Sequence, residues 1–163
     1  MRRGTARNLK ILAVSIAIPL VVGGLSALLT RGNMQIYSEV QTPPLAPPAV
    51  LFPIVWTLLY VLMGISAAIV WTNRKKDSEA AQSGLSAYAV SLAFNFTWSI
   101  LFFNFRRFGF ALIWLIVLWA LILITILQYR KISRPAAYLQ IPYAAWVAFA
   151  GYLNAGIWWL NRG

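Results

Sequence analysis

The stretch FGFALIWLIVLWALILITILQY, residues 108–129, contains no charged side chain and lies between Arg107 and Arg130. A bilayer core is ~30 Å thick, and one helical crossing needs ~20 apolar residues. Further uncharged runs of this kind lie on either side of it, at roughly residues 11–30, 47–73, 82–105 and 135–161. The five runs predict an all-α protein, an integral membrane bundle of five transmembrane helices that forms a single domain over residues 1–163.

The composition also indicates a membrane protein. Hydrophobic residues make up 61% of the chain and charged residues 10%, whereas soluble domains have ~45–50% and ~25%. The 14 Lys and Arg against 3 acidic residues give a net charge of +11. Because the basic residues lie between apolar runs, we expect them to face anionic lipid, and we expect no nucleic-acid partner.

The chain has no Cys and no His. It therefore has no disulfide, no Cys nucleophile and no His base, and it lacks the usual ligands of zinc, iron–sulfur clusters and His-bound haem. We predict no catalytic residue and no metal site.

The basic residues also predict an orientation in the membrane. Ten of the 14 Lys and Arg lie in the N-terminal segment and in the second and fourth connections, and four lie in the other connections and the C-terminal segment. The positive-inside rule then places the N-terminus in the cytoplasm and the C-terminus outside. A short, basic chain of this kind indicates a bacterial inner membrane.

The first connection, residues 31–46, is the longest. It contains Tyr37 and the proline pair Pro43-Pro44, and Pro47-Pro48 follows directly. Loops of this length often cover a binding site. The prolines alone are equally compatible with a plain turn that leads into the second helix.

Aromatic residues make up 15% of the chain. A belt at the bilayer interface accounts for many of them, and we assign to it Trp71, Trp114, Tyr129, Trp158 and Trp159. Other aromatic residues share a helix face with polar or small residues, at i+3 and i+4 spacing. These faces consist of Trp56, Tyr60 and Gly64 on the second helix, Asn95, Trp98 and Phe102 on the third, and Tyr143, Trp146, Ala150 and Asn154 on the fifth.

Amide and indole groups are costly in lipid unless they meet partners inside the bundle. The three faces therefore predict an aromatic cavity with a few polar anchors. Alternatively, Asn95 and Asn154 only tie helices together, through hydrogen bonds worth ~0.6–2 kcal/mol each. Small or polar residues also recur every fourth position along the third helix, which indicates either packing within the bundle or a homodimer seam; they are Ser83, Ala87, Ser91, Asn95 and Ser99.

Three motifs resemble those of one family. The segment PPLAPP at residues 43–48, followed by FPIVWTLLY at 52–60, resembles the second-helix signature of the TspO/MBR family, which comprises the tryptophan-rich sensory proteins, translocator proteins and peripheral-type benzodiazepine receptors. NFTWSILFF at 95–103 and PYAAWVAFAGYLN at 142–154 are similar to its third- and fifth-helix motifs. Together they cover most of the predicted bundle.

The resemblance implies a five-helix bundle, commonly a homodimer, that binds protoporphyrin IX, haem and related hydrophobic ligands. It implies no obligatory cofactor, with porphyrin or haem as ligand. Carried over by motif, the pocket walls are formed by Trp56 and Tyr60, by Asn95 and Trp98, and by Trp146, Ala150 and Asn154, under a lid that contains Tyr37. The cholesterol pattern of animal members has Arg soon after the fifth-helix motif, but here the basic residue is displaced to Arg162. Arg31 either meets a ligand propionate or is an ordinary interfacial charge.

Three functions fit these features. The first is a membrane receptor or carrier for tetrapyrroles, with a sensory or transport role. The second is an enzyme that degrades porphyrin with light and oxygen, using Trp56, Trp98 and Trp146 as electron donors. The third is an ion-coupled transporter, which the absence of acidic residues and His from the apolar runs disfavours.

Overall fold

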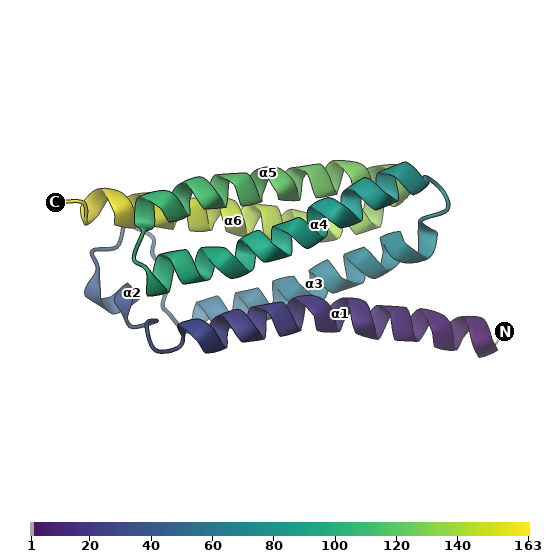
Figure 1. Ribbon diagram of the computed structural model, residues 1–163, viewed down its shortest axis with the longest axis horizontal. Helices are drawn as coiled ribbons and strands as arrows, with labels where there is room; N and C mark the ends of the chain where they lie inside the picture. Colours follow the sequence, from purple (N-terminus) through teal and green to yellow (C-terminus); the bar gives the residue numbers. More distant parts are fainter. Residues whose placement is uncertain (1) are drawn as a thin grey trace.

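The structure is a computed structural model that describes residues 2–163, with side chains from Gly4 onward. All secondary-structure elements of the described chain are helices, and none is a strand (Figure 1). Its elements are α1 (Arg2–Thr30), α2 (Ile36–Glu39), α3 (Leu51–Asn73), α4 (Ser78–Ser99), the π-helix η1 (Ile100–Asn104), α5 (Phe108–Ile132) and α6 (Arg134–Leu160).

The five predicted runs each correspond to a long helix, but the ends differ. The first helix begins at Arg2 rather than near residue 11, because a helix does not have to stop where the apolar sequence stops. The helix predicted from residue 47 begins at Leu51, after a turn in which Leu51 N donates to Pro48 O at 3.0 Å. The first connection contains the short helix α2, which its sequence did not indicate.

Side-chain caps fix two further helix starts. The Asp77 carboxylate accepts a hydrogen bond from Ala80 N, so α4 begins at Ser78 rather than near residue 82. The Ser133 hydroxyl accepts from Ala136 N at 3.4 Å and starts α6, with Pro135 in its first turn. The third predicted helix ends in η1, and α5 runs on to Ile132.

Four of the described helices are long and apolar enough to cross a membrane. They are Gly4–Thr30, Leu51–Asn73, Ser78–Asn104 and Phe108–Ile132. Helix α6 has the length, 27 residues, but contains the buried polar residues Gln140 and Asn154 and is not one of the four. The chain is therefore a helical membrane bundle with five long helices, four of which qualify as spans by length and composition.

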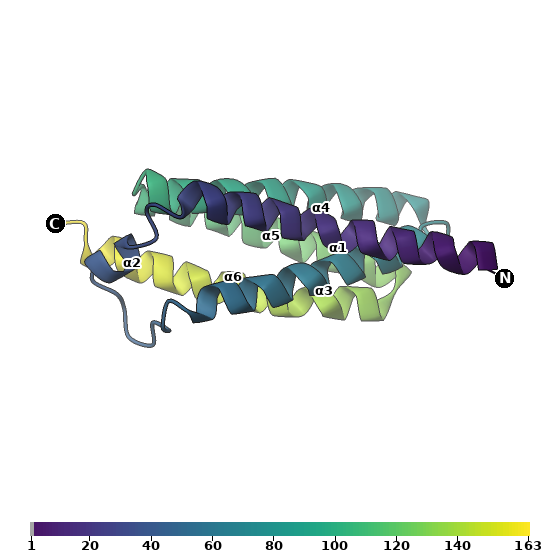
Figure 2. The ribbon, with the colours of Figure 1, turned by 90° about the horizontal axis from the view of Figure 1, so that it is seen from below.

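The long helices form a closed ring. Helix α1 packs against α3, α3 against α6, α6 against α5, α5 against α4, and α4 against α1. The N-terminal end of α1 and the α3–α4 and α5–α6 connections lie at one end of the bundle (Figures 1 and 2). The α1–α3 connection, the α4–α5 turn and the C-terminus lie at the other, so long helices that follow one another in the chain run antiparallel.

The belt and the small-residue stripe are only partly as predicted. Trp71, Trp158 and Trp159 are exposed, but Tyr129 is fully buried under Gly84 of α4 and was wrongly assigned to the belt. Half-buried Trp114 stacks on Phe94 with ring centroids 4.3 Å apart and donates to Thr97 Oγ1. Ser91 and Asn95 are buried inside the single chain, so the stripe packs within the bundle at these two positions, whereas Ser83 is exposed.

Candidate functional site

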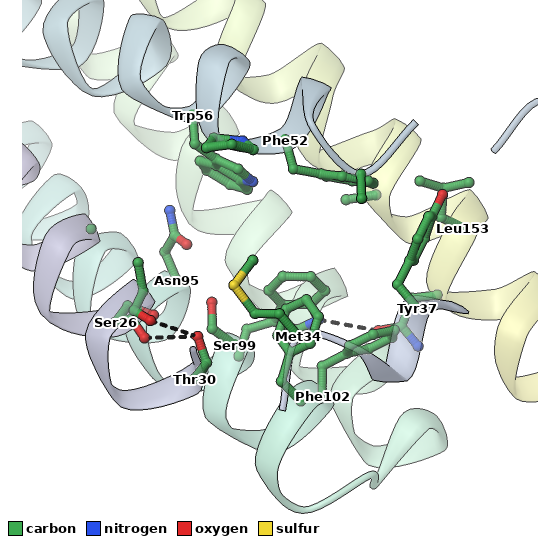
Figure 3. A pocket seen from close by; sticks show the side chains of 18 of the residues that line it. Ser26, Thr30, Met34, Tyr37, Phe52, Trp56, Asn95, Ser99, Phe102 and Leu153 are labelled. Carbon is green, nitrogen blue, oxygen red and sulfur yellow. Dashed lines mark hydrogen bonds between the residues drawn. The ribbon is translucent and has the colours of Figure 1, made fainter. Parts of the chain in front are cut away.

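A cavity of about 190 Å³ lies inside one end of the ring, under the connection between α1 and α3 (Figure 3). Its lining comes from α1, α3, α4, η1 and α6, together with Met34 and Tyr37 of the connection. Nine of the ten predicted site residues line it: Tyr37, Trp56, Tyr60, Asn95, Trp98, Phe102, Trp146, Ala150 and Asn154. The three helix faces therefore meet at one cavity.

Aromatic rings form two of the walls. On α3, Trp56 and Tyr60 are one turn apart and stack with ring centroids 5.6 Å apart. Phe52, one turn before Trp56, meets Trp146 of α6 edge to face at 5.9 Å. These rings present flat apolar surface on neighbouring sides of the cavity.

The π-helix η1 adds an aromatic residue to the third wall. Phe105 N donates to Ile100 O, five residues back, and this wider turn changes which side chains share a face. Phe103 therefore lines the cavity together with Phe102, and its ring lies 6.3 Å from that of Trp98. Helical periodicity selects Phe102 but not Phe103, because a regular α-helix turns residue i+5 away from residue i.

Both predicted asparagines tie helices together while lining the cavity. Asn154 Oδ1 accepts from Trp98 Nε1 at 3.1 Å, and Asn154 Nδ2 donates to Phe108 O at 2.8 Å. Asn95 Nδ2 donates to the Tyr143 hydroxyl at 3.2 Å. Tyr143 is 1% exposed and lies behind the wall, so it supports Asn95 and is the one predicted residue that does not line the cavity.

Trp146 Nε1 is different from the other polar groups of the walls. This atom is buried and has no hydrogen-bond partner among the described residues. An indole N–H left without an acceptor inside a membrane bundle is costly. This donor is therefore unsatisfied among the described residues.

No charged side chain of the described chain lines the cavity. Arg31 is exposed and lies outside the lining, where an ordinary interfacial charge would lie. Burial raises the pKa of the Tyr37 hydroxyl, which therefore remains neutral and donates to Pro47 O at 3.0 Å. The Tyr37 ring packs edge to face on Phe52, with centroids 5.2 Å apart.

A model of the TspO/MBR family matches residues 15–160. The chain belongs to this family. It is similar to the translocator protein of Bos taurus, with 37% identity over 146 residues, which are 89% of this chain and 86% of that protein. It is also similar to the tryptophan-rich protein TspO of Chlorobaculum tepidum, 36% identical over 92% of this chain and 95% of the relative. Protein CrtK of Rhodobacter capsulatus is 33% identical over 96% of each chain.

The family match includes every residue of this TspO/MBR cavity. The sequence interpretation missed the wall from α1, which includes Gly23, Ser26 and Thr30. These small or polar residues recur at i+3 and i+4 within an apolar run, which is the same signal that selected the other three faces. Ser26 and Thr30 are 5% and 3% exposed.

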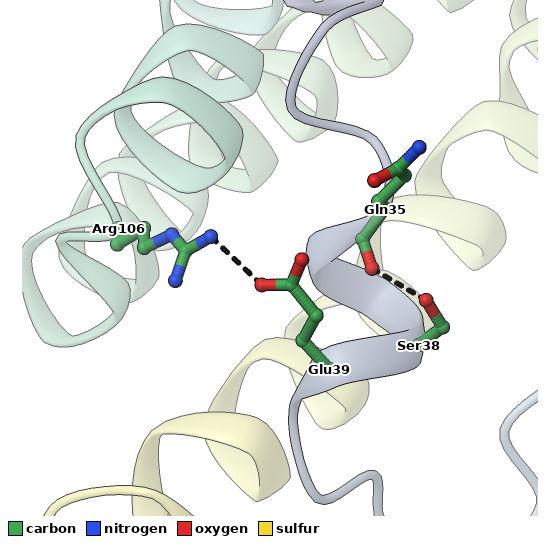
Figure 4. Close-up of polar contacts among 4 residues, drawn as sticks. All are labelled: Gln35, Ser38, Glu39 and Arg106. Carbon is green, nitrogen blue, oxygen red and sulfur yellow. Dashed lines mark hydrogen bonds and ion pairs between the residues drawn. The ribbon is translucent and has the colours of Figure 1, made fainter.

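The roof of this TspO/MBR cavity, residues 31–50, is fastened on two sides. Toward the α4–α5 turn, Asn33 Nδ2 donates to Asn104 Oδ1, and Glu39 of α2 pairs with Arg106, both at 2.9 Å (Figure 4). Toward α6, the Asn161 amide exchanges two hydrogen bonds with the backbone of Gln41, at 3.0 and 2.9 Å. The Tyr152 hydroxyl donates to Pro44 O at 2.7 Å.

Proposed function

We propose that this TspO/MBR protein binds a flat, conjugated, hydrophobic ligand of the tetrapyrrole class, such as protoporphyrin IX or haem, in the aromatic cavity. It would act as a membrane receptor or carrier with a sensory or transport role. The observation that carries the proposal is the aromatic wall of the cavity, to which α3, α4, η1 and α6 all contribute rings, with no charged side chain among the described lining residues. Such a site offers flat stacking surface, which suits a conjugated macrocycle.

We expect ring stacking, rather than charge, to supply the free energy of ligand binding in this cavity. Aromatic pairs contribute ~0.5–1.5 kcal/mol each beyond the burial of area. Asn95 and Asn154 use amide donors on protein acceptors, so their role is to hold the shape of the walls.

The size of the cavity adds a condition. Sites for drug-sized ligands are ~300–1,000 Å³, and this cavity is about 190 Å³. Binding of a macrocycle therefore requires the roof to move outward. The Arg106–Glu39 pair that fastens it is about half exposed on both sides, and exposed pairs contribute only ~0–1 kcal/mol.

The proposal includes a topology. Helix α6, 27 residues and therefore about 40 Å long, would be the fifth membrane crossing. The N-terminus would be cytoplasmic, since the ends of α1, α3 and α5 that carry most of the basic residues lie together. We further propose a bacterial inner membrane and a homodimer, whose mass in detergent can be measured by light scattering.

The experiment that tests binding compares two Trp→Phe variants in detergent. Trp146→Phe replaces an indole of the cavity wall by a smaller ring, whereas Trp159→Phe changes an exposed indole outside the cavity. Protoporphyrin IX binding is followed by its own absorbance and fluorescence anisotropy. We expect saturable binding that Trp146→Phe weakens about 2- to 12-fold through lost stacking, with Trp159→Phe unchanged. Linear uptake, or equal affinity in all three proteins, would show partition into the micelle and refute the site.

A second function is favoured by one observation: the indoles of Trp56, Trp98 and Trp146 all line this cavity. An indole beside a light-excited porphyrin can give it an electron, which the reduced porphyrin passes to O₂ to form superoxide. The indole radical cation then takes an electron back from the porphyrin, so that the net result is one-electron oxidation of the porphyrin by O₂. The loss of bound porphyrin is compared in light and dark, with and without O₂, and against free illuminated porphyrin. Faster light- and O₂-dependent loss in the protein than in free solution would support degradation, and equal rates would leave binding as the function.

A further inference from the structure

A second pocket, of about 350 Å³, lies at the opposite end of the bundle from the roof. It is formed where the start of α1 passes the last turn of α3 and the residues that follow it (Figure 2). Arg7, Arg74 and Lys75 bring three positive charges to its lining, and Trp71 and Ile11 bring apolar surface. The aromatic cavity and this pocket share no residue.

The positive charges of this pocket have no acidic partner. The one ion pair of the described chain, Arg106 with Glu39, lies at the roof end. No acidic residue lines the pocket, and the nearby Asp77 carboxylate caps α4 through Ala80 N. Three cationic side chains that surround one pocket without an acidic partner indicate a binding site for an anion.

Arg74 is held in place within this group. Its Nη1 donates to Trp71 O at 2.6 Å, and its guanidinium lies 4.5 Å from the Trp71 ring centroid. One nitrogen is thereby used, and the remaining donors of the guanidinium fork stay available for phosphate oxygens. Fixing the side chain in advance reduces the entropy that binding costs.

The position in the membrane identifies the kind of anion. Trp71 is 45% exposed at the end of a span, the level at which lipid headgroups lie. From Ile11 in the pocket wall, exposed apolar residues continue along α1 through Val14 and Ile18. A free phosphate ion would contact the cations but leave this apolar surface unused.

We propose that the pocket formed by Arg7, Arg74 and Lys75 binds the phosphate headgroup of an anionic phospholipid, with an acyl chain along the apolar side of α1. Basic pockets between transmembrane helices are suited to such headgroups. The site is independent of the aromatic cavity, so either proposal can fail without the other.

The test uses the purified full chain and native mass spectrometry. The protein is titrated with phosphatidylglycerol and with phosphatidylcholine of the same acyl chains. The test variant is Arg7→Gln/Lys75→Gln, and the matched control, Arg107→Gln/Arg162→Gln, removes two exposed charges at the other end. We expect tighter binding of phosphatidylglycerol, weakened about 5-fold per cation removed in the test variant and unchanged in the control.

Two kinds of result would overturn the proposal. Equal retention of the two lipids, or equal loss in test and control variants, would overturn the site. Inorganic phosphate that displaces phosphatidylglycerol at similar concentration would identify a soluble anion as the occupant and overturn the lipid assignment. Thermal unfolding in phosphatidylcholine micelles checks the fold of each variant, and the single Lys75→Gln variant replaces the double one if the latter is unstable.

Discussion

Asn154 joins three helices through a single amide. Its oxygen accepts from Trp98 on α4, its nitrogen donates to Phe108 O at the start of α5, and its own backbone belongs to α6. The residue is 1% exposed, so neither bond can be replaced by water without rearrangement. Asn154 therefore combines the two predicted roles: it lines the cavity and it holds three helices together.

Replacing Asn154 by Ala should therefore lower stability by about 1–3 kcal/mol, because the buried Trp98 N–H loses its acceptor and Phe108 O loses the donor from α6. Thermal unfolding in detergent, followed by circular dichroism, measures the change. In a double-mutant cycle with Trp98→Phe, the second substitution should cost less in the Asn154→Ala background. Additive effects would contradict the bond.

Two adjacent glycines of α1 give a matched pair of substitutions. A Cβ on Gly23 would overlap the Tyr60 ring, whereas a Cβ on Gly24 would meet no atom within 4 Å. We expect Gly23→Ala to push Tyr60 from its stack on Trp56 and to weaken porphyrin binding. Gly24→Ala should leave binding unchanged and raise stability by about 0.5–1 kcal/mol, since Ala is the better helix former. Equal binding by the two variants would place Tyr60 outside the site.

At the scale of elements, α1 and α3 approach closely because Gly64 lacks a side chain. An added Cβ would meet the α1 backbone at Ile16, and would lie 2.6 Å from Ser15 O. Neither is the end of a flexible side chain, so the helices themselves must separate.

Gly64→Ala should consequently lower stability by about 1–3 kcal/mol. Gly151→Ala on α6 is the control, because its Cβ would meet its nearest atom, Leu115 Cδ2, at an ordinary 3.8 Å. Thermal midpoints of the two variants in one detergent provide the comparison. A smaller loss for Gly64→Ala than for Gly151→Ala would contradict the close approach of α1 and α3.

The helix faces were predictable to different degrees. Trp56, Trp98 and Trp146 stand out because a polar or small residue recurs one turn away, and that periodicity survives in the fold. Phe103 does not, since it lies five residues after Trp98 and only the wider π-turn brings it to the same wall. Tyr143 lies three residues before Trp146, so the two side chains point about 60° apart around α6, and spacing alone does not show which of them lines the cavity.

For the molecule as a whole, uncharged runs between basic residues were enough to predict five long helices. They could not give the ring order α1, α3, α6, α5, α4, which depends on side-chain fit between helices distant in sequence. The helix ends also differed where caps and prolines, rather than hydrophobicity, decide them.

The roof links the first connection to the last helix, and we expect it to control ligand exchange. Asn161→Ala removes both side-chain bonds to Gln41 and should speed porphyrin dissociation several-fold, measured by stopped-flow fluorescence after dilution. The control is Asn73→Ala at the opposite end, where the amide bonds Ile69 O of its own helix. Identical dissociation rates would show that this fastening does not limit exchange.

The fastening of the roof to α6 can form only late in biosynthesis. The segment that covers the cavity leaves the ribosome early, before α3, whereas its partners Tyr152 and Asn161 are translated last. A nascent chain therefore exposes its aromatic interior throughout insertion and closes it only when the last helix docks. Substitutions at either end of this contact should show their largest effect in the yield of correctly inserted protein, since proteolytic quality control acts on the chain while its interior is still open.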